Sequence, residues 1–432
     1  MTWRRLAAVL LGALFVAAAV VVALNLRGED QGVDTPAAAA IATRSPADLV
    51  ARGEYLARAG DCIGCHTARG GVPYAGGRGI ETPFGTVYAP NLTPDPETGL
   101  GRWSANDFWR ALHNGRAPDG RLLYPVFPYP NYTRVVRADS DAMYAYLRSL
   151  PAVAQPNRPH ELGFPFNLQA ALAVWRALYF KPGVYVPDPA RSADWNRGAY
   201  LIEGLGHCNA CHSSRNALGA PAGPLDLAGG LIPVQNWYAP SLTAADESSV
   251  ADWDARDVVA LLKTGVSARG AVLGPMSEVV LNSTQYLSDS DLAAMTTFLK
   301  ALPANRTARP PPAAAPAPRT ETQARGAALY EKHCVGCHGE RGEGVAGAYP
   351  ALAGSRAVTM ASSANLVHVV LQGGFPPTTA GNPRPFGMPP FATMLSNAEV
   401  ADLLTFIRSA WGNSGGPVSA LDASRFRADV RP

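Results

Sequence analysis

Charged side chains are scarce in this sequence, and neither sign dominates. They make up 16% of the 432 residues, whereas an ordinary soluble domain has roughly 25%. The 37 basic and 34 acidic residues leave a formal net charge of +3. A nucleic-acid-binding protein normally shows a concentrated basic face. The even balance therefore predicts that the chain has no nucleic-acid partner.

Long, uninterrupted helical patterns are lacking as well, because glycine and proline are abundant. The chain has 42 glycines and 38 prolines, well above the roughly 12% that these two residues contribute on average. This composition argues against a coiled coil or a long helical bundle. We expect short helices joined by long, turn-rich loops, around something other than a purely side-chain core.

No cysteine is left over for a structural disulfide, because all six lie in three copies of one motif. The copies are Cys62-Ile-Gly-Cys65-His66, Cys208-Asn-Ala-Cys211-His212 and Cys334-Val-Gly-Cys337-His338. Cys-x-x-Cys-His is the attachment signature of c-type haem, in which the thiols bind the haem and the histidine is the proximal ligand of iron. A redox or zinc Cys-x-x-Cys with a chance histidine is the alternative, which three copies disfavour. The sequence predicts three covalently bound haem c groups.

Only one hydrophobic run is long enough to cross a membrane. It extends from Leu6 to Leu24, directly after Arg4 and Arg5, and as a helix it measures about 28 Å, close to the thickness of a bilayer core. The basic pair favours a cytoplasmic N-terminus, so the chain beyond Leu26 is expected outside the inner membrane. A cleaved signal peptide, cut near residues 17–19, is the alternative. The tail at 412–432 carries three arginines and is not expected to anchor the chain.

Three stretches of the chain follow one plan. Each haem motif follows an Arg-Gly pair and a few apolar residues, which together predict a short amphipathic helix. A second helix is predicted at the end of each stretch. The Arg-Gly pairs begin at Arg52, Arg197 and Arg325, and the closing helices carry an acid seven residues before an aromatic residue, at Asp139, Asp291 and Glu399. Ser288 and Ser396 stand three residues before the last two acids, a pattern that begins helices.

Helix, haem motif, long loop and closing helix is the plan of a small class I cytochrome c domain. The predicted fold is therefore mainly α, with three class I cytochrome c-like domains in tandem after one N-terminal transmembrane or signal helix. The predicted divisions are a signal or anchor helix at 1–27, a tether at 28–46, domain 1 at 47–181, domain 2 at 190–302, a proline-rich linker at 303–320, domain 3 at 321–411 and the tail at 412–432.

Residues 166–180 of domain 1 predict an extra helix. Its apolar stripe consists of Leu168, Leu172, Trp175 and Tyr179. We expect this helix to pack on the interface between the first two domains, and a lipid-facing helix is the alternative.

A cytochrome that only carries electrons usually closes the far side of its iron with methionine. Domain 2 offers Met276, 64 residues after His212, and domain 3 offers Met388, 50 residues after His338. Both are expected in proline-bearing loops that hold the sulfur rigidly. The alternatives are a buried core methionine in each case and Met394 in domain 3, whereas Met295 is expected in the core.

Domain 1 departs from this pattern, because Phe127 stands where the methionine is expected and cannot bind iron. The loop reads Tyr124-Pro125-Val126-Phe127-Pro128-Tyr129. Met143 matches a core position of the closing helix, and His113 is an alternative distal ligand. The other histidines outside the motifs, His160, His207, His333 and His368, are expected to be structural. The first haem is therefore predicted to be five-coordinate or to have a sixth ligand other than methionine.

On these residues the chain resembles the three-haem cytochrome c subunits of bacterial membrane-bound dehydrogenases. The resemblance covers nearly all of residues 45–412 and rests on 89–95, 195–212, 274–287 and 387–391. It implies haem-binding roles for Cys62, Cys65, His66, Cys208, Cys211, His212, Cys334, Cys337 and His338, and iron ligation by Met276 and Met388. Known partners in this family oxidise alcohols, aldehydes, gluconate, sorbitol or fructose at the periplasmic face. The Tyr-Pro-x-Phe-Pro loop resembles relatives that are paired with molybdenum hydroxylases.

The resemblance implies an electron relay rather than an enzyme. A catalytic subunit, which is a molybdenum hydroxylase, a quinoprotein or a flavoprotein, would reduce one haem, and the electrons would reach ubiquinone, a soluble cytochrome c or a terminal oxidase. The expected location is the periplasmic face of the bacterial inner membrane, with an N-terminal anchor. Two rival hypotheses are a multihaem peroxidase with an open iron at the first haem and a haem subunit of a respiratory oxidase.

Overall fold

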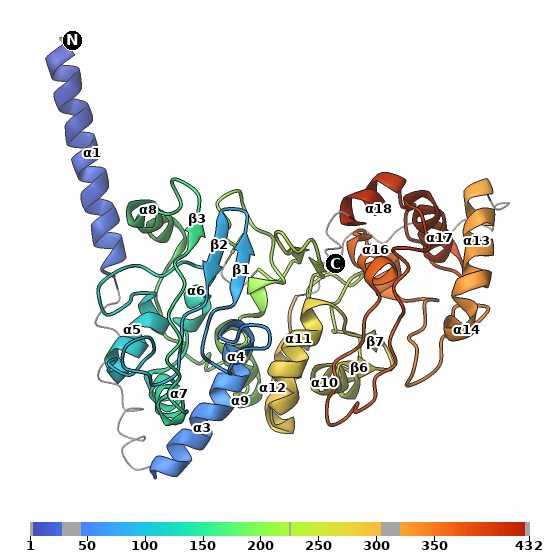
Figure 1. Ribbon diagram of the computed structural model, residues 1–432, viewed down its shortest axis with the longest axis horizontal. Coiled ribbons are helices and arrows are strands. Elements are labelled where there is room, and N and C mark those ends of the chain that lie inside the picture. The colour runs from blue at the N-terminus through green and yellow to red at the C-terminus, as the bar shows by residue number, and fades with distance from the viewer. Residues whose placement is uncertain (1–2, 28–44, 224–225, 304–319, 428–432) are drawn as a thin grey trace. The chain divides into compact units, whose positions relative to one another are not determined.

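The structure, a computed structural model, describes residues 3–27, 45–223, 226–303 and 320–427. The predicted tether and proline-rich linker, and the end of the tail, lie almost entirely outside the described residues. The described part is mainly helical, with three small antiparallel sheets (Figure 1). The chain divides into two compact units. The first comprises Met1–Asp188, Tyr200–His207 and Asn216–Ala220, and the second comprises Pro189–Ala199, Cys208–Arg215 and Pro221–Pro432.

The first unit begins with the apolar helix α1 and contains the first haem motif. Its elements are α1 (Trp3–Asn25), α3 (Pro46–Ala59), α4 (Cys62–Cys65), β1 (Gly79–Thr82), β2 (Gly85–Tyr88), α5 (Ala105–Asn114), α6 (Tyr129–Tyr132), α7 (Arg137–Ser149), β3 (Glu161–Leu162), α8 (Gln169–Tyr179) and the π-helix η1 (Tyr200–Leu205). The strands form one sheet in the order β1-β2-β3, with Gly79 opposite Tyr88 and Gly85 opposite Leu162.

The second unit contains the other two haem motifs. Its elements are α9 (Ala193–Ala199), η2 (Cys208–Ala210), β4 (Gly230–Leu231), β5 (Tyr238–Ala239), α10 (Ala255–Thr264), β6 (Val266–Ser267), β7 (Gly270–Ala271), α11 (Pro275–Asn282), η3 (Thr284–Tyr286), α12 (Asp289–Lys300), α13 (Glu321–His333), α14 (Val335–His338), α15 (Arg356–Thr359), α16 (Ala364–Gln372), α17 (Asn397–Ser409) and α18 (Ala420–Arg427).

Residues of predicted domains 2 and 3 bind one another within this second unit. The Tyr238 amide donates to Asn365 Oδ1 at 2.8 Å, and Asn365 Nδ2 donates back to the Tyr238 carbonyl at 2.7 Å. Thr379 Oγ1 donates to the carbonyl of Thr264. These bonds help to explain why two haem motifs share one compact unit.

One helix crossing occurs three times, where the helix before a haem motif meets a closing helix: α3 with α7, α9 with α12, and α13 with α17. The glycine of each Arg-Gly pair lies at the crossing. A Cβ atom there would overlap a backbone carbonyl oxygen of the closing helix, at 1.9 Å from Ala142 for Gly53, 2.1 Å from Ala294 for Gly198 and 2.2 Å from Asp402 for Gly326. Glycine therefore lets the two backbones touch, which explains the repeated residue.

The arginine of each pair binds a carboxylate on the closing helix. The Nε atoms lie 3.0 Å from Asp139 for Arg52, 2.8 Å from Asp291 for Arg197 and 2.6 Å from Asp402 for Arg325. Asp139 and Asp291 are the acids that the sequence pattern singled out. In the third crossing the partner is Asp402, and Glu399 instead completes a capping box with Ser396.

The predicted closing helices are confirmed, and their first turns differ. Ser288 caps α12 by accepting from the Asp291 amide, and Ser396 caps α17 in the same way, as the sequence predicted. The residue before α7 is Val136, whose side chain cannot cap the helix. Met143 and Met295 are buried in the closing helices, as predicted.

Part of the predicted tail belongs to a core. Helix α18 packs on α16 and α17. Its residues Ala423 and Phe426 are buried in the same hydrophobic core as the apolar residues of those two helices. The extra helix predicted at 166–180 is α8, and within the first unit it packs against α1. Of the described helices, α1 alone is long and apolar enough to cross a membrane, with a mean hydropathy of 2.8 in an 18-residue window of Arg5–Asn25.

Candidate functional site

The six cysteines lie in or next to short helical turns that follow the first helix of each crossing, and none of them forms a disulfide. In each motif the histidine amide donates to the carbonyl of the first cysteine, and the distance is 2.9 Å in all three: His66 to Cys62, His212 to Cys208 and His338 to Cys334. The same turn therefore presents two thiols and an imidazole three times over.

The first thiol of each motif is held in its neutral form. Burial raises the pKa of Cys62 and of Cys208 to about 12 and that of Cys334 to about 11. A redox or zinc-binding cysteine has a lowered pKa, because its thiolate is the reactive form. The thiols therefore fit the covalent attachment of a prosthetic group better than they fit thiol exchange.

Each motif histidine is oriented by one proline carbonyl. The Nδ1 atoms lie 2.8 Å from the Pro90 oxygen for His66, 2.7 Å from that of Pro240 for His212 and 3.2 Å from that of Pro350 for His338. This bond assigns the proton to Nδ1 and leaves the lone pair of Nε2 available to a metal ion. Burial lowers the pKa of all three histidines and so favours the neutral ring. The donor set of each motif fits haem c.

Sequence reasoning missed these proline carbonyls, although a signal for them exists. Each proline is the first residue of a Pro-x-Leu tripeptide: Pro90-Asn91-Leu92, Pro240-Ser241-Leu242 and Pro350-Ala351-Leu352. The prolines lie 24, 28 and 12 residues after their histidines. Because the separation varies, spacing alone did not connect them.

The two candidate methionine ligands have different settings. Met388 lies in a loop between helices, as expected; its amide donates to the Gly374 carbonyl at 2.8 Å and its carbonyl accepts from the Gly374 amide at 2.9 Å. Met276 lies in the first turn of α11 rather than in an irregular loop, directly after Pro275 at its N-terminus. Both side chains are half-buried, whereas the competitor Met394 is 55% exposed.

The corresponding loop of the first unit is held by aromatic contacts. The Phe127 ring lies 5.3 Å from the Tyr132 ring, and Tyr132 Oη donates to the Gly60 carbonyl at 2.8 Å, two residues before Cys62. Burial raises the pKa of Tyr132 strongly, and the neighbouring Cys62 adds to this effect. Phe127 therefore belongs to a packed aromatic group close to the first motif.

His113, the alternative distal ligand, is fully buried. Its Nδ1 lies 2.9 Å from the Thr133 carbonyl, and its ring stacks on Trp109 at 4.5 Å. Among the described residues, its Nε2 has no hydrogen-bond partner. Burial lowers the pKa of His113 to about 4, so the ring is neutral.

The other histidines make local contacts that suit the structural roles predicted for them. His160 Nδ1 accepts from the Tyr88 amide, and His207 and His333 lie edge-on to aromatic rings. His368 is fully buried in α16, and both of its ring nitrogens have partners: the Asn236 carbonyl at 3.2 Å and Gln372 Nε2 at 3.1 Å.

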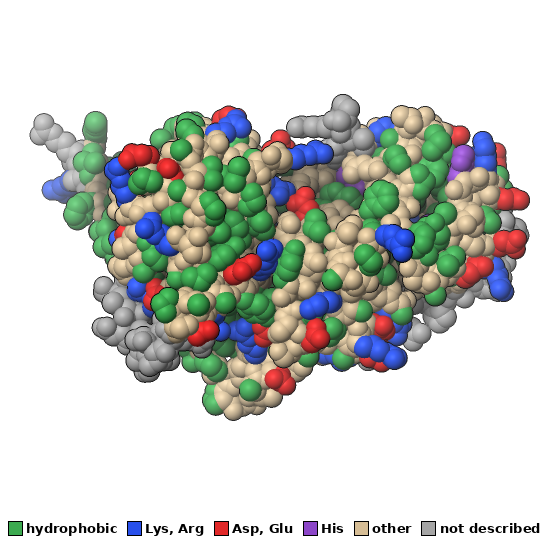
Figure 2. Space-filling view, turned by 60° about the horizontal axis from the view of Figure 1, so that its bottom comes forward, with side chains coloured by type: hydrophobic (Ala, Val, Ile, Leu, Met, Phe, Trp, Pro, Cys, Tyr) green, Lys and Arg blue, Asp and Glu red, His purple; other side chains and the backbone are tan. Residues whose placement is uncertain are grey.

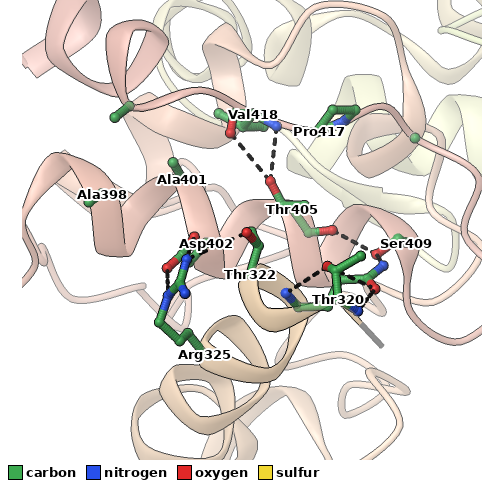
Figure 3. A pocket seen from close by; sticks show the side chains of 13 residues that line it. Thr320, Thr322, Arg325, Ala398, Ala401, Asp402, Thr405, Ser409, Pro417 and Val418 are labelled. Carbon is green, nitrogen blue, oxygen red and sulfur yellow. Dashed lines mark hydrogen bonds and ion pairs between the residues drawn. The ribbon is translucent and has the colours of Figure 1, made fainter. Parts of the chain in front are cut away.

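The described surface carries charges of both signs and an open pocket. On the face shown in Figure 2, basic and acidic side chains are interspersed, in agreement with the even charge balance. An open pocket of about 810 Å³ lies beside α13 and α17. Its polar side chains bind one another: Figure 3 shows Arg325 paired with Asp402 and Thr405 bonded to the backbone of Val418. None of the haem motifs lines this pocket.

Comparison with known proteins places these motifs in a family. The family model for cytochrome c matches residues 50–151 and 323–411, which contain the first and third motifs. The cytochrome c subunit of alcohol dehydrogenase (quinone) from Gluconacetobacter polyoxogenes is 39% identical over 92% of this chain and 88% of its own length. The gluconate 2-dehydrogenase cytochrome c subunit of Pantoea cypripedii is 37% identical over 88% of this chain and 90% of its own. A nicotinate dehydrogenase subunit from Pseudomonas putida is 42% identical over 84% of this chain but 30% of its own length.

Proposed function

The chain belongs to the family of cytochrome c subunits of bacterial dehydrogenases, and we propose that it carries three c-type haems. In such a complex it is the electron-transfer subunit and not the catalytic one. It relays electrons between the catalytic subunit and the respiratory chain. The observation that carries this proposal is the threefold repetition of one donor set, two thiols and an imidazole whose Nδ1 is bonded to a proline carbonyl.

Haem c, when bound, supplies a centre that gains and loses single electrons. The residues of this chain hold and tune it. The paired thiols fix the group covalently to a short helical turn, and the proline carbonyl fixes the orientation of the histidine ring and increases the basicity of Nε2. The crossing of two helices behind each motif keeps that turn in place.

Three cytochrome c domains, at 47–181, 190–302 and 321–411, are the arrangement that we propose. It is supported by the three helix crossings, each with its own Arg-Gly pair and Asp partner. Met276 and Met388 are the proposed sixth ligands of the second and third haems. The first haem has no methionine ligand in this proposal, because Phe127 occupies the corresponding loop.

The proposed partner is a dehydrogenase catalytic subunit, and two classes have specific support. Phe127 favours a molybdenum hydroxylase, and one relative belongs by name to a dehydrogenase of nicotinate, which is an aromatic N-heterocycle. A quinoprotein is the second candidate, supported by the relatives named alcohol dehydrogenase (quinone). Ubiquinone, a soluble cytochrome c or a terminal oxidase accepts the electrons.

The proposed location is the periplasmic face of the inner membrane, where α1 acts as the anchor. Over α1 the described apolar side chains are largely exposed, as a bilayer-spanning helix requires. Arg5 at its start favours a cytoplasmic N-terminus.

Two measurements test the relay. Mass analysis of the mature chain is expected to show three added haems, and removal of both thiols in the variant Cys62→Ala/Cys65→Ala is expected to leave two. The complex purified from membranes is then mixed with substrates of the catalytic subunit, and reduction of the haem absorbance is followed in time. Fewer than three haems in the parent chain would contradict the haem count. Peroxide turnover by the isolated chain would instead support the peroxidase, and co-purification with a copper oxidase would support the oxidase subunit.

A further inference from the structure

The last residue of α1 is tied to α8 by buried hydrogen bonds. Asn25 Nδ2 donates to the Ala173 carbonyl of α8 at 2.9 Å, and Asn25 Oδ1 accepts from Arg176 Nε at 2.9 Å. Arg116 also donates to the Asn25 carbonyl at 3.2 Å. Asn25 is 8% exposed and Arg176 is 2% exposed. Helix α8 therefore lies directly beside the end of α1 (Figure 1).

This connection fixes the level of α8 if α1 is the membrane anchor. The helix has 23 residues and is about 34 Å long at 1.5 Å per residue, only slightly more than the roughly 30 Å of a bilayer core. Asn25 then emerges at the membrane surface, because nearly the whole helix is needed to cross the core. Any element bonded to Asn25 must lie at the same surface.

The outer side of α8 is suited to that position. Val174 and Leu178, one turn apart, are 47% and 64% exposed, and Tyr179 beside them is 38% exposed. All residues of α8 are described, and its only charged residue is the buried Arg176. An 11-residue helix whose outer side has no charge is unusual in contact with water.

Exposed apolar residues also occur in the segments that flank α8 in the sequence. Phe164 and Val186 are each 80% exposed, and Leu168 is 44% exposed. Trp175 of α8 donates its Nε1 hydrogen to the Leu218 carbonyl at 2.9 Å. Tryptophan and tyrosine are the residues that proteins place at the boundary between water and lipid.

We propose that the α8 face, defined as Leu168, Val174, Leu178 and Tyr179, rests in the headgroup and upper acyl region of the bilayer that α1 crosses. The inference rests on the anchoring role of α1 in the proposed function. A single transmembrane helix leaves the domain that it carries free to tilt. A second, interfacial contact beside the exit of α1 holds the first unit, and with it the first haem motif, in one orientation to the membrane.

The test uses the whole complex in nanodiscs made of phosphatidylcholine that carries a photoreactive diazirine in its acyl chains. After illumination, lipid adducts are located on peptides by mass spectrometry. Adducts are expected on α1 and on 164–186. The variant Val174→Glu/Leu178→Glu is expected to lower adducts on 164–186 by at least ~5-fold, because charges are poorly tolerated among lipid chains, while α1 adducts and the haem spectrum stay unchanged.

The outcomes separate the inference from the proposed anchor. Absence of adducts on both α1 and α8 would remove the anchor, and with it the basis of the inference. Adducts on α1 alone would overturn the inference and leave the anchor intact. In that case, protection of 164–186 from hydrogen exchange only when the catalytic subunit is present would show that the α8 face binds protein instead of lipid.

Discussion

The first and third haem motifs have nearly the same proximal side and different distal sides. His66 and His338 both place Nδ1 on a proline carbonyl, at 2.8 and 3.2 Å, behind the same kind of helix crossing. On the proposed distal side the first has Phe127 among tyrosine rings, whereas the third has Met388 in a backbone bridge with Gly374. In the proposed arrangement, haem attachment and the sixth iron ligand are therefore specified by separate parts of the chain. The distal loop can change while the attachment site stays the same.

Exchanging the distal residues tests this separation most directly. Met388→Ala is expected to abolish a sulfur-to-iron charge-transfer band near the red end of the oxidised spectrum and to lower one haem potential by a sizeable part of the roughly 0.8 V range that axial ligands set. Phe127→Met is expected to add such a band. Spectra and potentiometric titrations of the purified complex measure both.

The exposed Met394 provides the matched control, because Met394→Ala is expected to leave the band unchanged. If Met394→Ala removes the band and Met388→Ala does not, the assignment is wrong. Electron paramagnetic resonance of the parent chain is expected to show one species without methionine ligation.

Because the first and third motifs share the same helix crossing, we expect equal losses of folding stability when either crossing is disrupted. Gly326→Ala and Gly53→Ala place a methyl group 2.2 and 1.9 Å from a backbone oxygen, so each is expected to lower the free energy of unfolding by about 3 kcal/mol or more. Thermal unfolding followed by circular dichroism measures the loss. Gly183→Ala and Gly416→Ala are the controls, since nothing lies within 4 Å of a methyl group at either position. Wild-type stability of the crossing variants would show that the backbones are not in contact.

Two buried histidines, His113 in α5 and His368 in α16, differ in their hydrogen bonds. Burial lowers the pKa of His113 to about 4, while a histidine in an unfolded chain has a pKa of about 6.5. The unfolded chain therefore takes up the proton first, and the free energy of unfolding falls as the pH drops from about 6.5 to about 4, by up to about 3 kcal/mol. His113→Gln is expected to remove this part of the pH dependence.

Chemical denaturation at several pH values measures that effect. His368→Gln is the control, because both nitrogens of His368 have partners, and this variant is expected to keep the His113 contribution. An unchanged pH dependence in His113→Gln would mean that His113 takes up its proton at the same pH in the folded and the unfolded chain.

The smallest predicted effect concerns the first turns of the closing helices. Ser396 caps α17, whereas α7 begins at Arg137, and Val136 before it provides no side-chain cap. Ser396→Ala is expected to cost about 1 kcal/mol, or about 2–4 °C in the unfolding midpoint of a unit as large as the second one. Thr393→Ala, at an exposed position nearby, is expected to change nothing. Equal midpoints for the two variants would rule out a contribution from the cap.

Some features of this protein follow from local sequence alone. The haem motifs, the helices before them, the closing helices and the serine caps depend on residues within one or two turns of each other. The same holds for the apolar helix α1. Membership of the dehydrogenase cytochrome c subunits, inferred from such motifs, is confirmed by the comparisons. The three-domain division and the methionine ligands stay predictions.

Other features were decided by the tertiary structure. The proline carbonyls meet their histidines across 12 to 28 residues of loop, Arg325 pairs with Asp402 and not with Glu399, and α18 joins a core from what the sequence marked as a tail. Met276 lies in a helix, and α8 packs on α1. Local pattern determines which bonds a short segment can make within itself. Which distant atoms meet depends on how loops close and helices cross, and the energy of those contacts is set only when the chain has folded.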